Sequence, residues 1–264
     1  MRKILKKFLS IMLAVCMSAG FIPFITTPAS AHQGTHGTDT VYANSGNMVN
    51  KVAAQMQKRR KRIVLYYHGS SASLDGRMAS LYDISTPTSH QYTLDTMKDL
   101  YYTIDWSYQK KGWVKYILTP NYKLTDTQEA ATQKKVKSIL KKLHLKGTAY
   151  SKAVKLNDYL AKHVSYLRHQ GTAYDALVKG KGNCQAYSEA FYLLALNSGI
   201  RVKMMDGLGG NDEHQWNCFK SGKTWYSIDT CWNKGHKGHP WLRKGFYLKD
   251  HKASQKIVRM IKRG

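Results

Sequence analysis

The order of helical and strand patterns along the chain is the feature that most restricts its fold. Thr125-Asp126-Thr127 offers an N-cap for a helix that continues to about Leu143. A second helical pattern covers Ser151 to about Val164, and a third, buried one covers Cys184–Asn197. Strand patterns follow at 200–206, 213–220, 223–230 and 245–248. Helices followed by an antiparallel meander predict an α+β fold and not a doubly wound one.

The stretch before these helices is less regular. The β-branched and aromatic run Ile63-Val64-Leu65-Tyr66-Tyr67 predicts the first strand of the folded part. A helix is expected from about Thr93 to Asp105, and a strand from Trp113 to Leu118 that Pro120 stops. We therefore expect an N-terminal α/β extension over 63–145 and a core domain over 146–264.

The first 31 residues have the pattern of a secretory signal peptide. Basic residues open the chain, an apolar stretch follows to about Ile25, and Ala29-Ser30-Ala31 fits a cleavage site. A retained membrane anchor is the alternative, although Pro23 and Pro28 interrupt the segment. No later stretch is apolar enough to cross a bilayer. We expect a secreted protein, extracellular or associated with the cell wall, in which residues 32–62 form a flexible basic linker or a pro-segment.

Basic residues greatly outnumber acidic ones. The chain has 42 Lys and Arg against 16 Asp and Glu; the leader holds four of the basic residues, which leaves 38 against 16, or +22. Such an excess affects partners more than fold, and it favours anionic cell-wall polymers as partners of this basic protein. A solvated basic surface without a partner is the alternative. No motif that reads nucleic acid is present, so we expect no nucleic-acid partner.

Cys184 is the strongest candidate for a reactive group. It follows the turn Gly180-Lys181-Gly182-Asn183 and opens the third predicted helix. Unpaired backbone N–H groups and the helix dipole at that end favour a thiolate, which is the nucleophilic form of cysteine. The same N–H groups can stabilise a developing oxyanion. The alternative is a small buried cysteine without a reactive role, because Cys is among the most buried residue types.

A predicted hairpin places a histidine beside an aspartate. If Ser221-Gly222 is a two-residue turn, paired residue numbers sum to 443 and His214 lies opposite Asp229. Their side chains then share one face, close enough for the carboxylate to hold an imidazole N–H. His214 would take the thiol proton of Cys184, and Asp229 would orient the imidazole. Trp216 lies on the same face and is expected to wall the site and contact substrate, with core packing as the alternative.

The same register keeps Cys218 and Cys231 apart. They would be six residues out of step along the strands, roughly 20 Å at the rise of a β-strand. Disulfide Cα atoms lie within about 7 Å of each other, so we expect no bond between these two cysteines.

Three motifs resemble those of the transglutaminase-like superfamily. Residues 182–187, Gly-Asn-Cys-Gln-Ala-Tyr, resemble its G-x-C-x-G/A-Y nucleophile motif, and residues 214–217 resemble its H-x-W-N motif. Residues 225–232 resemble its W-Y-x-V-D-x-T-W motif, in the same order and spacing. Cys231 departs from the usual threonine, and Asn233 from the usual aspartate.

The resemblance implies a papain-like transglutaminase core, with the nucleophile at the start of a central helix packed on an antiparallel sheet. It also implies that Cys184, His214 and Asp229 form a catalytic triad. Tyr166 is a candidate for the family's second oxyanion donor.

A Cys-His-Asp triad of this kind implies acyl transfer through a thioester on protein or peptide amides. A lysine amine as acceptor makes a transglutaminase, and water makes a protease or amidase, with the same residues in both. The alternative is a catalytically dormant transglutaminase-like module that binds anionic cell-wall or surface polymers. The sequence shows no Ca²⁺-binding loop pattern, so no metal and no other cofactor is expected.

Overall fold

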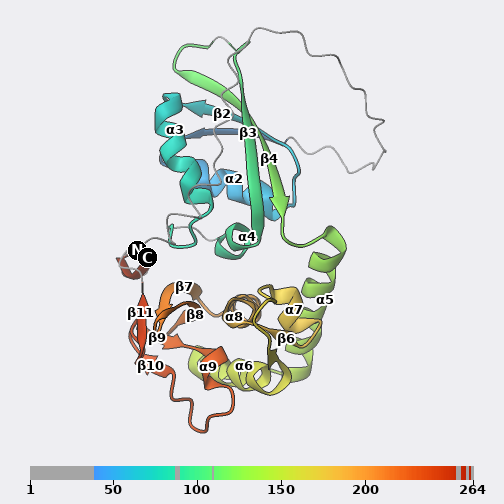
Figure 1. The fold of residues 1–264 in the computed structure, drawn as a ribbon, viewed down its shortest axis with the longest axis vertical. Coiled ribbons are helices and arrows are strands. Elements are labelled where there is room, and N and C mark those ends of the chain that lie inside the picture. Colours follow the sequence, from blue (N-terminus) through green and yellow to red (C-terminus); the bar gives the residue numbers. More distant parts are fainter. Residues whose placement is uncertain (1–38, 87–89, 109, 254–256, 260–261, 263–264) are drawn as a thin grey trace. The chain divides into compact units, whose positions relative to one another are not determined.

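The computed structural model describes residues 39–86, 90–108, 110–253, 257–259 and 262 (Figure 1). The predicted signal peptide lies outside these described residues. Among the residues described, no helix combines the length and apolar character needed to span a membrane.

A four-stranded sheet of order β1-β2-β4-β3 forms the N-terminal extension (Figure 1). β1 runs parallel to β2, and the other neighbours are antiparallel. One face of the sheet buries apolar side chains in a cluster with residues of α2 and α3. The elements are β1 (Thr40–Asn44), α2 (Met48–Gln57), β2 (Ile63–His68), α3 (Ser71–Met78), the 3-10 turn η1 (Ala79–Leu81), α4 (Gln91–Asp95), β3 (Met97–Asp105) and β4 (Trp113–Tyr122).

Strand β1 and helix α2 occupy most of residues 40–57, so the expectation of a flexible linker over residues 32–62 is wrong for that part. Val41 and Ala43 alternate inward on β1, while Met48, Val52 and Met56 recur at helical spacing on α2. All five are at most 5% exposed. The few apolar residues of this polar stretch lie on single faces, and that placement is sufficient to anchor both elements.

Two other predictions in the extension are wrong. Most of 93–105 is strand β3 instead of a helix, because Leu100, Tyr102 and Ile104 alternate toward the core with the period of a strand. β4 continues through Pro120, since its pairing with β2 ends at Leu118. On the other side, Pro120 lies opposite Leu100 of β3. The backbone N–H and carbonyl of Leu100 form hydrogen bonds with the Tyr82 hydroxyl, so they do not need the N–H that proline lacks.

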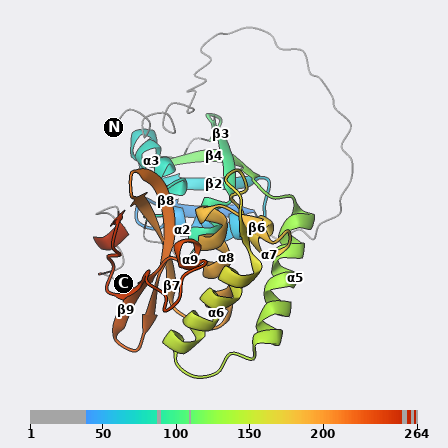
Figure 2. The same ribbon diagram turned by 60° about the horizontal axis from the view of Figure 1, so that its bottom comes forward.

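The core domain confirms the predicted α+β fold. Helix α8 (Cys184–Asn197) packs on strands β7 and β8, and also contacts α5, α6 and α7 (Figure 2). Its residues Ala186 to Ala195 are all buried. The other helices are α5 (Asp126–Leu143), α6 (Ala149–His163), α7 (Ala173–Leu177) and α9 (Thr230–Asn233). As predicted, Thr125 caps α5, here in a capping box with Gln128.

A five-stranded antiparallel sheet of order β10-β9-β8-β7-β11 lies against α8. Its strands are β7 (Val202–Gly209), β8 (Asp212–Ser221), β9 (Thr224–Ile228), β10 (Leu242–Lys244) and β11 (His251–Ala253). The strand expected at 245–248 is thus replaced by β10 just before it. A separate parallel pair, β5 (Ser165–Tyr166) and β6 (Lys181–Gly182), precedes α8.

The β8–β9 hairpin differs from the predicted register. Ser221 pairs with Thr224, so paired numbers sum to 445 instead of 443 and the turn is Gly222-Lys223. Gly222 has φ of +58°, as a type II′ turn requires at its first central position. Each residue of β8 therefore pairs with the β9 residue two positions after the predicted one. Because side chains alternate with a period of two along a strand, every side chain stays on its predicted face of the sheet.

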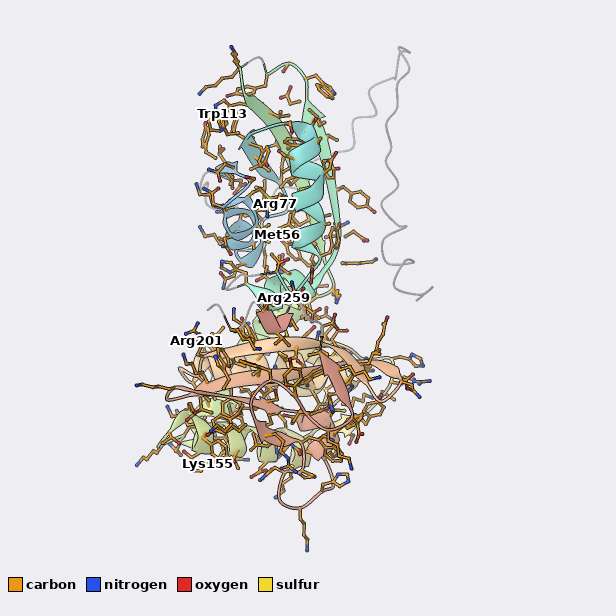
Figure 3. All side chains as sticks on the ribbon, turned by 90° about the vertical axis from the view of Figure 1, so that its left-hand side faces the viewer. Met56, Arg77, Trp113, Lys155, Arg201 and Arg259 are labelled. Atoms are coloured by element: carbon orange, nitrogen blue, oxygen red, sulfur yellow. The ribbon has the colours of Figure 1, made fainter. Side chains whose placement is uncertain are left out.

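Shortening a buried side chain of α2 tests whether residues 40–57 belong to the core. Met56 is fully buried among side chains of the extension (Figure 3), whereas its neighbour Gln57 is exposed. Met56→Ala should lower the free energy of unfolding by about 2–5 kcal/mol through lost burial and a residual cavity. Urea denaturation measures this, with Gln57→Ala as the control. Equal, small effects of both substitutions would show that α2 adds nothing to the core.

Candidate functional site

Cys184 is the first residue of α8, and its position is fixed by the residues before it. The Asn183 side chain caps the helix by accepting the Ala186 N–H at 3.2 Å, and it donates to the Arg168 carbonyl at 3.1 Å. Gly182 approaches the helix so closely that a Cβ there would lie 2.3 Å from the Ala186 Cβ. Hydrogen bonding from the backbone N–H groups of Gln215 and Gln185 helps to lower the pKa of the Cys184 thiol.

His214 lies on β8 and interacts with both proposed partners. Its Nε2 is 2.6 Å from Asp229 Oδ2, and it lines the same cavity as Cys184, whose hydrogen bonding and charge help to raise the pKa of His214. Since Nε2 faces the carboxylate, Nδ1 is the nitrogen available to exchange a proton with the sulfur. Gly209 on β7 makes room for the ring, because a Cβ at that position would lie 2.8 Å from His214 Cγ.

Asp229 is almost completely buried, at 1% exposure, and both of its carboxylate oxygens are occupied. It follows the last residue of β9 and caps α9, where Oδ1 accepts the Trp232 N–H at 3.0 Å. Oδ2 accepts from His214 and also from His251 Nε2, at 2.7 Å. The structure thus brings Cys184, His214 and Asp229 together, although His214 and Asp229 are not direct cross-strand partners.

The protonation equilibria favour a thiolate beside an imidazolium. Burial opposes ionisation of Cys184, but the hydrogen bond and charge of His214 outweigh it and lower the pKa of the thiol below 9.0. Burial likewise opposes the charged form of His214, yet its bonds to Asp229 and Cys184 raise the pKa to about 9. Burial also opposes the Asp229 carboxylate, and hydrogen bonds from His214 and His251 lower its pKa nonetheless.

The other two described cysteines differ in reactivity from Cys184. All three are free thiols, and Cys218 lies in the core while Cys231 is partly exposed. Burial raises the pKa of Cys218 to about 12. Burial also raises the pKa of Cys231, and the charges of Asp229 and Cys184 add to the effect. Cys184 is therefore the one of these thiols that its environment activates.

A cavity of about 820 Å³ opens onto this site. Tyr166, the candidate second oxyanion donor, lies in its wall, as do Cys231 and Trp232. Burial and then the electrostatic influence of the nearby cysteines, Cys184 first, raise the pKa of Tyr166, so its hydroxyl keeps the proton with which it could donate. The lining residues are Tyr166, Arg168, Asn183, Cys184, Gly209, Asp212, Glu213, His214, Cys231, Trp232, Lys234 and Gly235.

Trp216 does not take the place that was expected for it at the substrate. It is 1% exposed, and it is not part of the cavity wall. Its ring stacks on His214 with centroids 6.0 Å apart and meets His251 edge-on at 4.8 Å. Trp216 therefore supports the imidazoles from behind, because its side chain points into the core, and Trp232 is the tryptophan that faces the cavity.

Sequence reasoning missed Asp95, which α4 of the extension brings to the site. Its Oδ2 accepts from Gln185 Nε2 at 3.1 Å and from Gln215 Nε2 at 3.3 Å. These two glutamines directly follow Cys184 and His214 in the sequence. One carboxylate oxygen therefore links the start of α8 to β8, and no local pattern near residue 95 signals this contact.

Glu189 is fully buried one turn after Gln185 on α8. Its Oε2 accepts the Ala173 N–H at 2.7 Å, and Gln185 donates to Oε1 at 3.3 Å. Burial, followed by the charge of Asp95, raises the pKa of Glu189 well above 4.5. The protonated carboxyl can then donate to Asp95.

His251 was also missed, and it completes a cluster of possible metal ligands. One ligand atom each from His214, Asp229 and His251 lie within 4.8 Å of one another. Both imidazoles already bond to the same carboxylate oxygen, so an ion could enter only by replacing those hydrogen bonds. The arrangement fits a hydrogen-bonded cluster better than an open metal site.

Comparison with known families agrees with this geometry. Residues 137–230, which include Cys184, His214 and Asp229, match the model of the transglutaminase-like superfamily. Over this segment the chain is similar to the superfamily. The match supports a function of the general cysteine-protease or transglutaminase-like kind. No curated protein sequence matches the chain significantly.

Several solved structures are similar to this chain at low identity. A candidate cysteine protease from Cytophaga hutchinsonii is 16% identical, with a TM-score of 0.35 over 56% of this chain and 69% of the other. A TGase is 11% identical, with a TM-score of 0.37 over 74% and 60% of the two chains. Calcium-bound LapG of Legionella pneumophila is 15% identical, with a TM-score of 0.30 over 60% and 93%.

Selective alkylation tests the ionisation of the three thiols. Iodoacetamide should modify Cys184 at neutral pH well before Cys218 and Cys231, because only Cys184 has a lowered pKa. His214→Ala removes the groups that lower it, so alkylation at neutral pH should slow about tenfold or more. Peptide mass spectrometry measures each site separately. Equal rates at all three cysteines, or no change in His214→Ala, would contradict the activated thiol.

The buried acid of α8 predicts a pH-dependent stability difference. Because the folded-state pKa of Glu189 is raised, its contribution to stability is complete below about pH 4.5 and is lost as pH rises toward the folded pKa. Glu189→Gln mimics the protonated acid and does not titrate. Above pH 4.5, the free energy of unfolding of the variant should therefore rise relative to that of the wild type by up to about 1.4 kcal/mol per pH unit.

Urea denaturation from pH 4.5 to 8 measures this difference. The stability difference between Glu189→Gln and Glu189 should be smaller when both proteins also carry Asp95→Asn. The reason is that the charge of Asp95 is the second cause of the raised pKa of Glu189. A difference between Glu189→Gln and wild type that stays constant with pH would refute the prediction.

Proposed function

We propose that this chain is a secreted cysteine acyltransferase that acts on protein or peptide amides, with Cys184 as nucleophile, His214 as acid and base, and Asp229 as the group that orients His214. The placement of Cys184 and His214 together in the wall of the cavity, with His214 also bonded to Asp229, is the observation that carries the proposal. The hydrogen bonding and charge of His214 lower the pKa of the Cys184 thiol, and an amide in the cavity can reach both groups.

The first half of the reaction forms a thioester. The Cys184 thiolate attacks the amide carbonyl carbon, a C–S bond forms, and the carbonyl oxygen becomes an oxyanion. Backbone N–H groups at the start of α8 and the Tyr166 hydroxyl are the donors available to that oxyanion. The C–N bond then breaks, and the leaving amine or ammonia takes the proton from the His214 imidazolium.

The second half returns the enzyme to its starting state. The acceptor, an amine or water, gives a proton to His214 as it attacks the thioester carbon. The C–S bond breaks and leaves the thiolate beside the imidazolium again. A lysine amine as acceptor gives a crosslinked product, and water gives hydrolysis, with the same three residues in the same roles.

Secretion is part of the proposal and has separate support. The first 31 residues have the composition of a signal peptide, and the remaining chain carries a formal charge of +22. A strongly basic exported protein meets anionic polymers of the cell wall and the cell surface. We propose that such a polymer retains the protein close to the proteins it modifies.

Incorporation of a fluorescent amine separates the possible activities. Wild-type protein is incubated with monodansylcadaverine and casein, and dye in the protein band, released ammonia and peptide fragments are measured. Label incorporation indicates a transferase, and ammonia or fragments without label indicate a hydrolase. Cys184→Ala should abolish either product, because the nucleophile is lost.

Cys218→Ala is the matched control, since Cys218 is a buried cysteine outside the cavity wall and its removal should leave the product yield within a few-fold. If no product forms and the three cysteines are alkylated at equal rates, the acyltransferase proposal is wrong and a catalytically dormant polymer-binding module is favoured. Equal product from wild type and Cys184→Ala would show that another group performs the chemistry.

A further inference from the structure

A second histidine bonds to the same carboxylate oxygen as His214. His251 is the first residue of β11, and its side chain is fully buried. Its Nε2 lies 2.7 Å from Asp229 Oδ2, and its Nδ1 lies 2.8 Å from the backbone carbonyl oxygen of Lys249. Both ring nitrogens of His251 are therefore within hydrogen-bond distance of an oxygen.

Neither of these oxygens can donate a proton. The Lys249 carbonyl oxygen is an acceptor only, and Asp229 is held as a carboxylate by the hydrogen bonds that it receives. A neutral imidazole has one N–H, so one of its nitrogens would direct a lone pair at an oxygen less than 3 Å away. Both contacts are satisfied only when His251 carries a proton on each nitrogen.

We propose that His251 is a buried imidazolium that shares the charge of Asp229 with His214 and so sets the pH range over which the Cys184–His214 pair is ionised. His251 is a positioning residue in this proposal, because it acts through Asp229 and is not part of the cavity wall. The proposal goes beyond the acyl-transfer function and rests on it only for the biological use of the thiolate.

The surroundings of His251 make its charge effective. Trp232 and Trp216 pack against the ring, with centroids 4.5 and 4.8 Å away, so little water screens it. The titratable groups that face it are Asp229 and His214, whose ring centroid is 5.2 Å away, and Cys184 lies beyond His214. Charged residues on β7, β8 and β11 that are exposed to solvent are Asp206, Asp212, Glu213 and Lys252.

The direction of the effect follows from this geometry. Loss of a positive charge next to Asp229 makes the nearby thiolate less stable, so Cys184 would ionise at higher pH. The same loss leaves the full charge of Asp229 to His214, so its imidazolium would persist to higher pH. Both limbs of the pH dependence therefore move upward together when His251 is replaced by a neutral residue.

The test is the pH profile of Cys184 alkylation in His251→Gln. Glutamine keeps an amide N–H that can bond to Asp229, but it has no charge. We expect the rise of the alkylation rate with pH to shift upward by about one pH unit, which is about a tenfold slower reaction on its acidic side. A profile that overlaps the wild-type profile would overturn the proposal, because a hydrogen bond alone would then account for His251.

His239→Gln is the matched control. His239 also bonds to a carboxylate, with Nε2 2.6 Å from Asp158 Oδ1, but this pair is exposed and outside the cavity wall. The alkylation profile of His239→Gln should match that of the wild type. A shift equal to that of His251→Gln would show that loss of any His–Asp pair moves the profile, and would also overturn the proposal.

A second measurement does not depend on a variant that folds. In ¹⁵N-labelled wild-type protein, the His251 ring should give signals for two protonated nitrogens at neutral pH, where Cys184 is alkylated selectively. A single protonated nitrogen there would refute the imidazolium. Neither measurement uses turnover of an amide, so a failure of the proposed acyltransferase activity stays distinguishable from a failure of this inference.

Discussion

The buried carboxylate of Asp229 is the group on which the arrangement of the site depends. Burial of a carboxylate is unfavourable unless hydrogen bonds replace the lost water, and here both oxygens are occupied. The donors come from β8, from β11 and from the first turn of α9, while Asp229 itself follows β9. One residue therefore ties three strands and a helix together, and the orientation of His214 toward Cys184 follows from those contacts.

Asp95 performs a comparable task from the extension. It holds the side chains of Gln185 and Gln215, and the backbone N–H groups of these residues help to lower the pKa of the Cys184 thiol. The superfamily match begins at residue 137, so this support comes from a part of the chain outside the matched segment. The extension is consequently part of what fixes the distance between the helix of Cys184 and the strand of His214. A site supported from both sides is formed before substrate arrives.

The features that the sequence predicted well are those with local causes. The N-cap at Thr125 and the bounds of the Cys184–Asn197 helix depend on side chains within one turn of the boundary. The hairpin turn was misplaced by one residue because Ser221-Gly222 and Gly222-Lys223 both contain the glycine that a tight turn needs. The meeting of His214 and Asp229 survived that error, since the slip preserved the face of each residue. His251 and Asp95 could not be found in this way, because their partners lie 22 to 120 residues away and leave no periodic trace.

The charges of the site balance locally, and this separates its chemistry from the basic character of the chain. With His251 protonated, the thiolate, the carboxylate and the two imidazoliums form two ion pairs of zero net charge, which lowers the cost of burying them beside tryptophans. The cavity wall adds Arg168 and Lys234 against Asp212 and Glu213, again two of each sign. The excess of 42 Lys and Arg over 16 Asp and Glu therefore does not arise from this cavity wall. If the proposed anionic polymer binds the chain, its attraction would act on groups other than those proposed for acyl transfer.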